Sequence, residues 1–169
     1  MKKIFMMMMM LAVAVGIEAQ TKYHDVEAND AKGAVKTMTS NTVGQEQTIN
    51  FSQDGKMEQK STTDIVYDAD GYIKSAKVEV RGQQMEVKYT WENGRVKSQS
   101  MEMMGQPMTV THKYNEKGEN TADEINVAGQ SMETAYTDYK YDAKGNWISR
   151  KTSIMGQQME QKRSFEYYE

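Results

Sequence analysis

The sequence predicts an all-β fold, an antiparallel meander of about eleven or twelve strands built from hairpin repeats. Three observations lead to this prediction. Glycines recur at fixed spacing, the residues between them alternate between apolar and polar, and proline, which interrupts strand pairing, occurs only once. We expect the sheet to curl into a barrel-like or gutter-like shape, because twisted sheets of more than about ten strands rarely stay open.

The glycine spacing defines an internal repeat. Five leading glycines are each followed eleven residues later by a second glycine, and every second glycine is followed by glutamine. The leading glycines are Gly33, Gly71, Gly94, Gly118 and Gly145, and the second glycines are Gly44, Gly82, Gly105, Gly129 and Gly156. Five equal spacings indicate a repeat array, in which the two kinds of glycine mark two opposite sets of turns.

Between the glycines, the apolar residues recur with a period of two. Residues 85–92 alternate strictly, and the segment from Met108 continues with Val110, His112 and Tyr114 on one face. This pattern is typical of strands with one buried face and one wet face. Since no helical stripe supplies a cover, the sheet must roll up or be covered by a second copy, and we favour the rolled sheet.

Two segments do not follow the repeat. Where a Gly-Gln pair is missing, we expect residues 62–64, Thr-Thr-Asp, to supply the turn. Residues 22–32 are compatible with one turn of helix, but they hold few apolar residues with which to dock it.

The parity of the apolar positions changes within each repeat. The second residue after a leading glycine is mostly apolar, and further along the seventh and ninth are apolar instead, as in Ile73, Val78 and Val80. A β-bulge in each strand accounts for this change. Placement of the second residue on the outer side near the rim accounts for it equally well.

The first residues predict an export signal. Lys2 and Lys3 precede an apolar stretch from Ile4 to Val15, and Ala19 fits the last position before a cleavage site. We therefore expect a signal peptide at residues 1–19 and one β-repeat domain at residues 20–169. A membrane anchor is the alternative, but an apolar stretch of about twelve residues is shorter than the roughly twenty that span a bilayer. The protein is expected in the periplasm, at the cell surface or outside the cell.

Composition excludes several classes of function. The chain has no cysteine, which excludes disulfides, thiolate metal sites and a cysteine nucleophile. The net charge is −3 and the charges are interspersed. Nucleic acid is therefore excluded as a partner, because phosphate binding needs a basic patch, and no membrane span is expected once the signal is removed.

Residues 139–147, Tyr-Lys-Tyr-Asp-Ala-Lys-Gly-Asn-Trp, resemble the YD repeat, also called the Rhs repeat, of bacterial secreted and surface proteins. Residues 67–71 carry the same Tyr-Asp-x-x-Gly core, and degenerate copies begin at Phe51 and Tyr114. The chain looks like the short exported relatives of Bacteroidetes type. The resemblance implies β-hairpins wound into a curved shell. The resemblance supports the fold and export but says little about activity, because this chain is too short to enclose the cargo domains of the large members.

The sequence shows no catalytic constellation, and we expect no enzyme activity and no cofactor. His112 lies on the alternating apolar face, where a packed or hydrogen-bonded histidine is the main expectation. Residues 68–71 begin like a calcium loop, but Tyr72 and Lys74 occupy ligand positions, so a hairpin turn is favoured.

Two alternatives to a soluble β-repeat protein remain open. Met101, Met103, Met104 and Met108 flank one hairpin, and clustered thioethers bind Cu(I), which suggests a copper-binding envelope protein. Methionines that fill an irregular core are favoured, because Met85, Met108, Met132 and Met159 hold equivalent repeat positions. An outer-membrane β-barrel is the other alternative, opposed by His112, Gln161 and Arg163 on its lipid face.

Aromatic residues gather at one end of the predicted meander, beside the leading glycines. We expect them to form an interaction surface for a glycan or a protein, with the alternative that they plug the barrel mouth. The candidate residues are Tyr89, Trp91, Tyr114, Tyr139, Tyr141 and Trp147. The function expected from the sequence is that of a secreted or periplasmic, non-catalytic scaffold or binding module.

Overall fold

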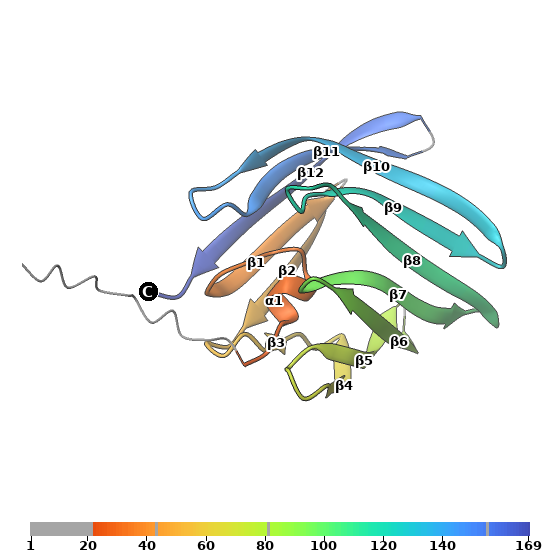
Figure 1. Ribbon diagram of the computed structural model, residues 1–169, viewed down its shortest axis with the longest axis horizontal. Helices are drawn as coiled ribbons and strands as arrows, with labels where there is room; N and C mark the ends of the chain where they lie inside the picture. The colour runs from red at the N-terminus through yellow and green to blue at the C-terminus, as the bar shows by residue number, and fades with distance from the viewer. Residues whose placement is uncertain (1–21, 43, 81, 155) are drawn as a thin grey trace, which may run out of the picture.

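The fold is one twelve-stranded antiparallel sheet that wraps into a nearly closed barrel (Figure 1). The computed structural model describes residues 22–42, 44–80, 82–154 and 156–169. The expected signal peptide at residues 1–19 lies outside these ranges. The described elements are α1 (Asp25–Ala28), β1 (Val35–Thr42), β2 (Gln45–Phe51), β3 (Met57–Glu58), β4 (Thr62–Tyr67), β5 (Ile73–Val80), β6 (Gln83–Glu92), β7 (Arg95–Met103), β8 (Gln106–Tyr114), β9 (Asn120–Val127), β10 (Gln130–Tyr141), β11 (Trp147–Ile154) and β12 (Gln157–Tyr167).

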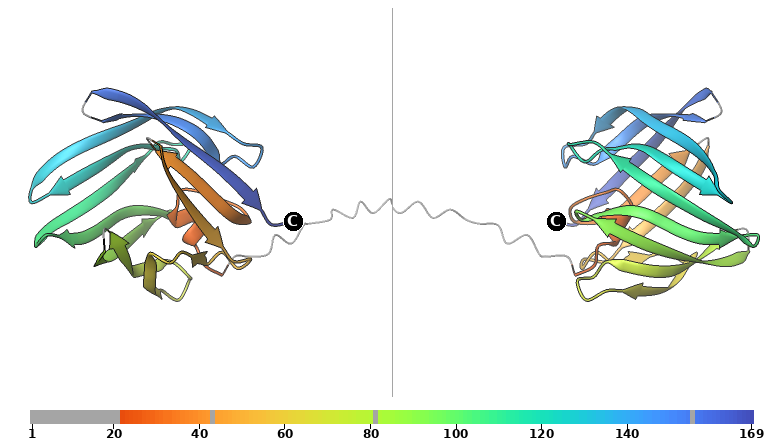
Figure 2. Two further views of the ribbon diagram at one scale, coloured as in Figure 1. Left: turned by 180° about the vertical axis from the view of Figure 1, so that it is seen from behind. Right: turned by 45° about the vertical axis from the view of Figure 1, so that its right-hand side comes forward.

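The barrel closes between the two ends of the chain. β1 pairs antiparallel with β12, so that the first strand lies beside the last (Figure 2). The unsealed seam falls instead between β3 and β4, the two edge strands of the sheet. The predicted meander and its strand number are confirmed, and the rolled form is a barrel with one seam.

The seam corrects the expectation for residues 62–64. These residues do not form a turn but begin β4, and the turn lies just before them, where Thr62 N donates to Gln59 O at 3.1 Å. Asp64 adopts a positive φ of 49° within the strand. β3 and β4 are consecutive in the chain but stand at opposite ends of the strand order.

The change of parity comes from β-bulges. Register shifts occur in the hairpins β4–β5, β6–β7, β8–β9 and β10–β11, all of which turn at leading glycines. The hairpins that turn at Gly-Gln sites run in register without a shift. Each bulge turns the second residue after the glycine inward, which decides between the two explanations of the sequence pattern.

The aspartate of the Tyr-Asp-x-x-Gly core stabilises its turn. Asp68 Oδ1 accepts hydrogen bonds from the backbone N–H groups of Asp70 and Tyr72, at 3.0 and 2.9 Å. Asp142 does the same for Lys144 and Asn146. The segment that resembles the start of a calcium loop is therefore a hairpin turn, as favoured from the sequence.

The helix α1 lies inside the barrel at the end of the leading glycines (Figures 1 and 2). Residues 22–34, which we call the plug, cross this end and contribute to the core. That core contains Val26, Ala31, Val35, Met38, Ile49 and Phe51. Val26 is 2% exposed, so the expectation that this segment could not dock was wrong. The two small apolar side chains Val26 and Ala31 suffice because Asp25 is also held by polar contacts: its Oδ2 accepts from Met57 N and from the Tyr67 hydroxyl.

Candidate functional site

The plug forms one wall of a pocket of about 360 Å³ at its end of the barrel. Two hydrogen bonds fix the plug beside β11: Lys32 N donates to Asn146 Oδ1 and Asn146 Nδ2 donates to Lys32 O, at 2.8 and 2.9 Å. The other walls come from β7 to β11 and their turns. The lining includes four of the six aromatic residues that the sequence singled out, namely Tyr114, Tyr139, Tyr141 and Trp147.

The other two candidate aromatics lie outside this pocket. Trp91 Nε1 donates to Ile73 O at 2.8 Å, and its ring packs 4.8 Å from that of Tyr72. Burial raises the pKa of Tyr89, as expected for an interior hydroxyl. Tyr89 and Trp91 therefore belong to the packing of β5 and β6 and not to the pocket.

The aromatic rings of the pocket form an ordered platform. Tyr139 and Tyr141 stack with ring centroids 5.9 Å apart and planes 12° apart, and Trp147 meets Tyr139 edge-on. Tyr141 is 41% exposed, whereas Trp147 is 6% exposed. The pocket thus presents one accessible tyrosine ring, which stacks on the half-buried Tyr139, and Tyr139 in turn contacts the buried Trp147.

Polar acceptors surround the platform. Glu119 accepts hydrogen bonds from the Tyr141 hydroxyl and from Asn115 Nδ2. The first of these bonds holds the pKa of Glu119 below its ordinary value, while burial and the same bond raise the pKa of Tyr141. Asn120 Oδ1 and Glu27 Oε2 are buried without a hydrogen-bond partner. Both residues line the pocket. Glu27 Oε2 lies 3.6 Å from His24 Nδ1, so Asn120 Oδ1 is the acceptor that a bound donor would satisfy.

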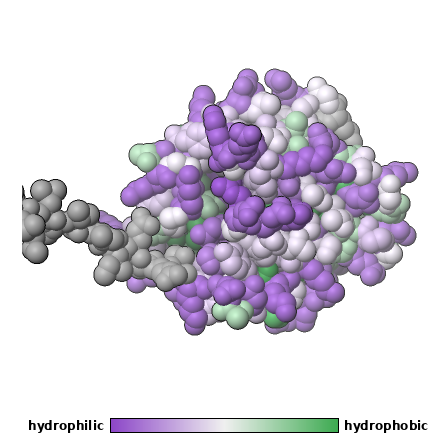
Figure 3. Space-filling model, in the orientation of Figure 1, coloured by the Kyte–Doolittle hydropathy of each residue, from purple (hydrophilic) through white to green (hydrophobic). Residues whose placement is uncertain are grey.

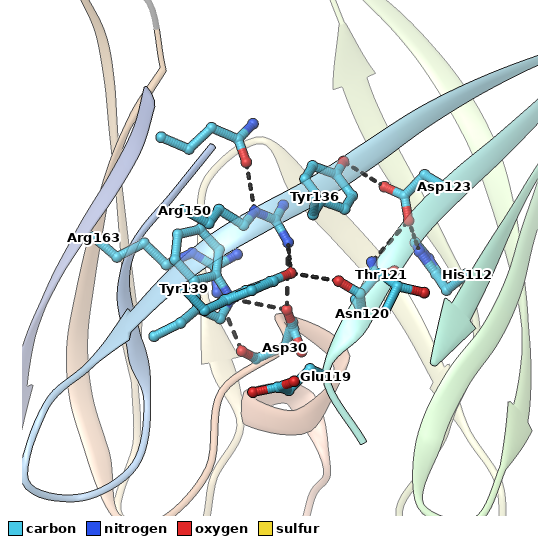
Figure 4. Close-up of polar contacts among 12 residues, drawn as sticks. Asp30, His112, Glu119, Asn120, Thr121, Asp123, Tyr136, Tyr139, Arg150 and Arg163 are labelled. Atoms are coloured by element: carbon cyan, nitrogen blue, oxygen red, sulfur yellow. Dashed lines mark hydrogen bonds and ion pairs between the residues drawn. The ribbon is translucent and has the colours of Figure 1, made fainter. Parts of the chain in front are cut away.

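A buried polar cluster lies beneath the platform (Figure 4). The Arg150 guanidinium lies 3.5 Å from the Tyr136 ring centroid and donates to the hydroxyl of Tyr139 at 3.1 Å. Trp147 Nε1 donates to Asp30 Oδ2 at 2.8 Å, which ties the plug to β11. These contacts lock the orientation of Tyr139 and Trp147, as a binding platform requires.

His112 belongs to the same cluster and is hydrogen-bonded, as the sequence indicated. Its Nδ1 lies 2.6 Å from Asp123 Oδ1, and Tyr136 donates to Asp123 Oδ2 at 2.8 Å. Burial disfavours the Asp123 carboxylate, but the hydrogen bonds from His112, Asn120 and Tyr136 outweigh it, so the pKa of Asp123 lies below its usual value.

A second, wider hollow of about 1330 Å³ lies on the other side of the plug. Its lining includes Tyr23, Tyr67, Tyr167 and Tyr168 together with Lys22 and Lys144. Tyr168 donates to Phe51 O and Tyr67 donates to Asp25, so these hydroxyls are committed to the fold. The smaller pocket is the stronger candidate, because it combines an accessible ring face with the unpartnered acceptor Asn120 Oδ1.

The polar members of the pocket were missed by sequence reasoning. Asp30 and Glu27 lie in a segment outside the repeat. Glu119 and Asn120 follow the turn glycine Gly118, and this glycine predicts a hairpin turn but no role in binding. Within the described ranges, no group of three histidine, aspartate or glutamate side chains is placed to hold a metal ion. Among the same residues, no helix combines the length and hydrophobicity that a membrane crossing requires.

Comparison with known proteins assigns no family to the chain. No protein-family model matches it, and no curated protein matches it significantly.

Proposed function

We propose that the chain is an exported, non-catalytic binding module that takes a carbohydrate in the pocket of Tyr114, Tyr139, Tyr141 and Trp147. The observation that carries the proposal is the exposed Tyr141 ring in the same pocket as Asn120 Oδ1, a buried acceptor without a hydrogen-bond partner. A sugar ring offers an apolar face that packs on an aromatic ring and hydroxyl groups that donate to such acceptors. A pocket of about 360 Å³ matches the low end of small-molecule sites.

The outer surface supports a protein that works in water. Charged side chains project outward from the barrel and pair across strands: Lys113 contacts Glu124 at 3.0 Å and Glu133 at 2.6 Å. The face shown in Figure 3 is largely hydrophilic. A lysine facing lipid at the bilayer midplane costs about 2–4 kcal/mol, which favours the binding module over the outer-membrane barrel.

Calorimetric titration against a panel of mono- and oligosaccharides tests the proposal. At least one saccharide should bind with one-to-one stoichiometry. Burial of about 50 Å² of the Tyr141 ring contributes about 1.3 kcal/mol, so Tyr141→Ala should weaken binding about tenfold.

Tyr141→Phe is the matched variant, since it keeps the ring and removes only the hydroxyl that contacts Glu119. It should bind within a few-fold of the parent. Equal affinity of the parent and Tyr141→Ala for every bound saccharide would place the binding elsewhere, and absence of any saccharide binding would refute the proposal.

A further inference from the structure

Toward the Gly-Gln end, the inner face of the barrel carries apolar side chains that are not buried, with Gln83, Gln106 and Gln130 beside the turns. Ala76 and Val87 pair across β5 and β6, are 1% and 5% exposed, and so identify the inner face. Toward the Gly-Gln turns, the same face continues with Val78, Val80, Met85, Met101, Met103, Met108, Val110, Ile125, Val127, Met132 and Met159. None of these eleven side chains is buried, and Val80, Met103 and Met132 are 44%, 39% and 60% exposed.

Methionine dominates this wall in a regular way. Met85, Met108, Met132 and Met159 each follow a turn glycine by three residues, so they lie at one level of the barrel. Methionine is unbranched and adapts its shape to irregular apolar partners, which is why it is common at surfaces that bind apolar groups. An apolar wall inside a barrel that remains accessible to water suits an alkyl ligand better than a sugar.

Deeper in the barrel lie two guanidiniums. Arg163 is 3.7 Å from the Trp147 ring centroid and donates only to backbone carbonyls of Asn29 and Asp30, while its Nε is buried without a partner. Arg150 Nε donates to Gln161 Oε1 at 2.6 Å, and Asp30 Oδ2 lies 3.8 Å from Arg150 Nη1. Among the described residues, Asp30 is the one carboxylate within ion-pair distance of either arginine.

Two further observations show that the region of the two arginines has only partial charge compensation, although Asp30 lies near Arg150. Burial lowers the pKa of Arg163 to about 10, against an attraction from Asp30 that does not offset it. Thr152 Oγ1 is also buried without a partner, on the same strand face as Arg150 and two residues closer to the Gly-Gln end. Arg163 Nε and Thr152 Oγ1 are therefore the two unpartnered groups in this region, and Thr152 pairs with Met159 of the methionine wall.

We propose that the barrel interior binds a free fatty acid through the Gly-Gln end. The alkyl chain lies along the methionine wall, and the carboxylate accepts hydrogen bonds from Arg163 Nε, Arg150 and Thr152 Oγ1. In the unliganded protein the neutral Gln161 carbonyl occupies the place of the carboxylate at Arg150. Charge complementarity selects this occupant, because a carboxylate offers only acceptors and binds guanidinium groups in a bidentate manner.

Methionine-methyl NMR with dodecanoate tests this proposal. The methyl signals of Met85, Met108, Met132 and Met159 should shift on titration, and that of Met104, which is 90% exposed at a turn, should not. Dodecanol should bind at least about tenfold more weakly, since charge-assisted hydrogen bonds are lost. Absence of shifts, shifts that include Met104 equally, or equal affinity for acid and alcohol would overturn the proposal.

Three variants separate binding in the interior from nonspecific adsorption. Met132→Asp places a negative charge in the wall and should weaken dodecanoate at least about tenfold, whereas Met104→Asp should leave it unchanged. Arg163→Lys keeps the charge but removes the Nε donor and should also weaken dodecanoate. Equal affinity of all three variants would overturn the proposal. Saccharide binding should be unchanged in Met132→Asp, so the two sites fail or succeed separately.

Discussion

The substitution Gly71→Ala tests how the plug is held, and Gly129→Ala is its matched control. Both glycines have positive φ angles, 89° and 86°, which cost an alanine about 1 kcal/mol. A Cβ at Gly129 would meet no atom within 4 Å, but a Cβ at Gly71 would lie 2.0 Å from the Lys22 carbonyl oxygen. The plug must move to admit it.

That movement has a calculable cost. His24 N donates to Gly71 O at 3.1 Å and Tyr23 N donates to Asp54 O at 3.0 Å, and each bond contributes about 0.5–1.5 kcal/mol. Gly71→Ala should therefore destabilise the protein by about 3 kcal/mol in total, against about 1 kcal/mol for Gly129→Ala. For a domain of this size the melting temperatures should fall by about 9 °C and about 3 °C, measured by differential scanning calorimetry. Equal decreases would refute the docking of the plug at this turn.

Three further predictions concern the core and its buried carboxylates. Phe51→Ala should cost about 3–5 kcal/mol in urea denaturation, because Phe51 is 1% exposed among apolar neighbours; a loss below about 1 kcal/mol contradicts that core. Burial raises the pKa of Asp25 above its unfolded value, so its contribution to the free energy of unfolding should grow as pH falls from neutral through the raised pKa. Asp25→Asn should remove this dependence of the free energy of unfolding on pH. An unchanged dependence in the variant would contradict the raised pKa of Asp25. Asp123 has a lowered pKa, so its contribution is present above the unfolded pKa and is lost as pH falls through the folded pKa. The free energy of unfolding of Asp123→Asn should therefore fall furthest below that of the parent near neutral pH, and the difference should be small in strong acid. A difference that does not depend on pH would contradict this.

The repeat made most of the strands predictable from sequence. Alternation between successive turns depends on local residues, and the strands follow it. The pairing of β1 with β12 has no local signal, because it joins residues such as Met38 and Phe165 that are distant in sequence. The position of the seam follows from the irregular connection before Thr62, where the repeat lacks its Gly-Gln pair.

The site was predictable only in part. Tyr114, Tyr139, Tyr141 and Trp147 come together because neighbouring hairpins place equivalent positions at the same end of the barrel. Tyr89 and Trp91 lie near the same end on β6, the strand next to β7, but Trp91 packs toward Ile73 and Tyr72 and away from the pocket. The contribution of Asp30 has no sequence signal at all, since it depends on how the plug crosses the barrel.

The interior arginines illustrate the same limit. Alternation places Arg163 and His112 on the apolar face, where their polarity is evidence against a lipid-facing surface. In the structure this face is the barrel interior, and both side chains are accommodated by partners from other strands, such as Trp147 for Arg163 and Asp123 for His112. Those partners are set by sheet closure, which the local pattern does not encode.

Aromatic-carbon NMR of a saccharide titration tests the central claim most directly. With all tyrosines labelled, the ring signals of Tyr139 and Tyr141 should shift with the same dissociation constant as calorimetry, because both rings border the pocket. The signals of Tyr72 and Tyr168, which lie outside it, should stay in place. Shifts confined to Tyr168 and its neighbours would move the site to the wider hollow and contradict the proposed function.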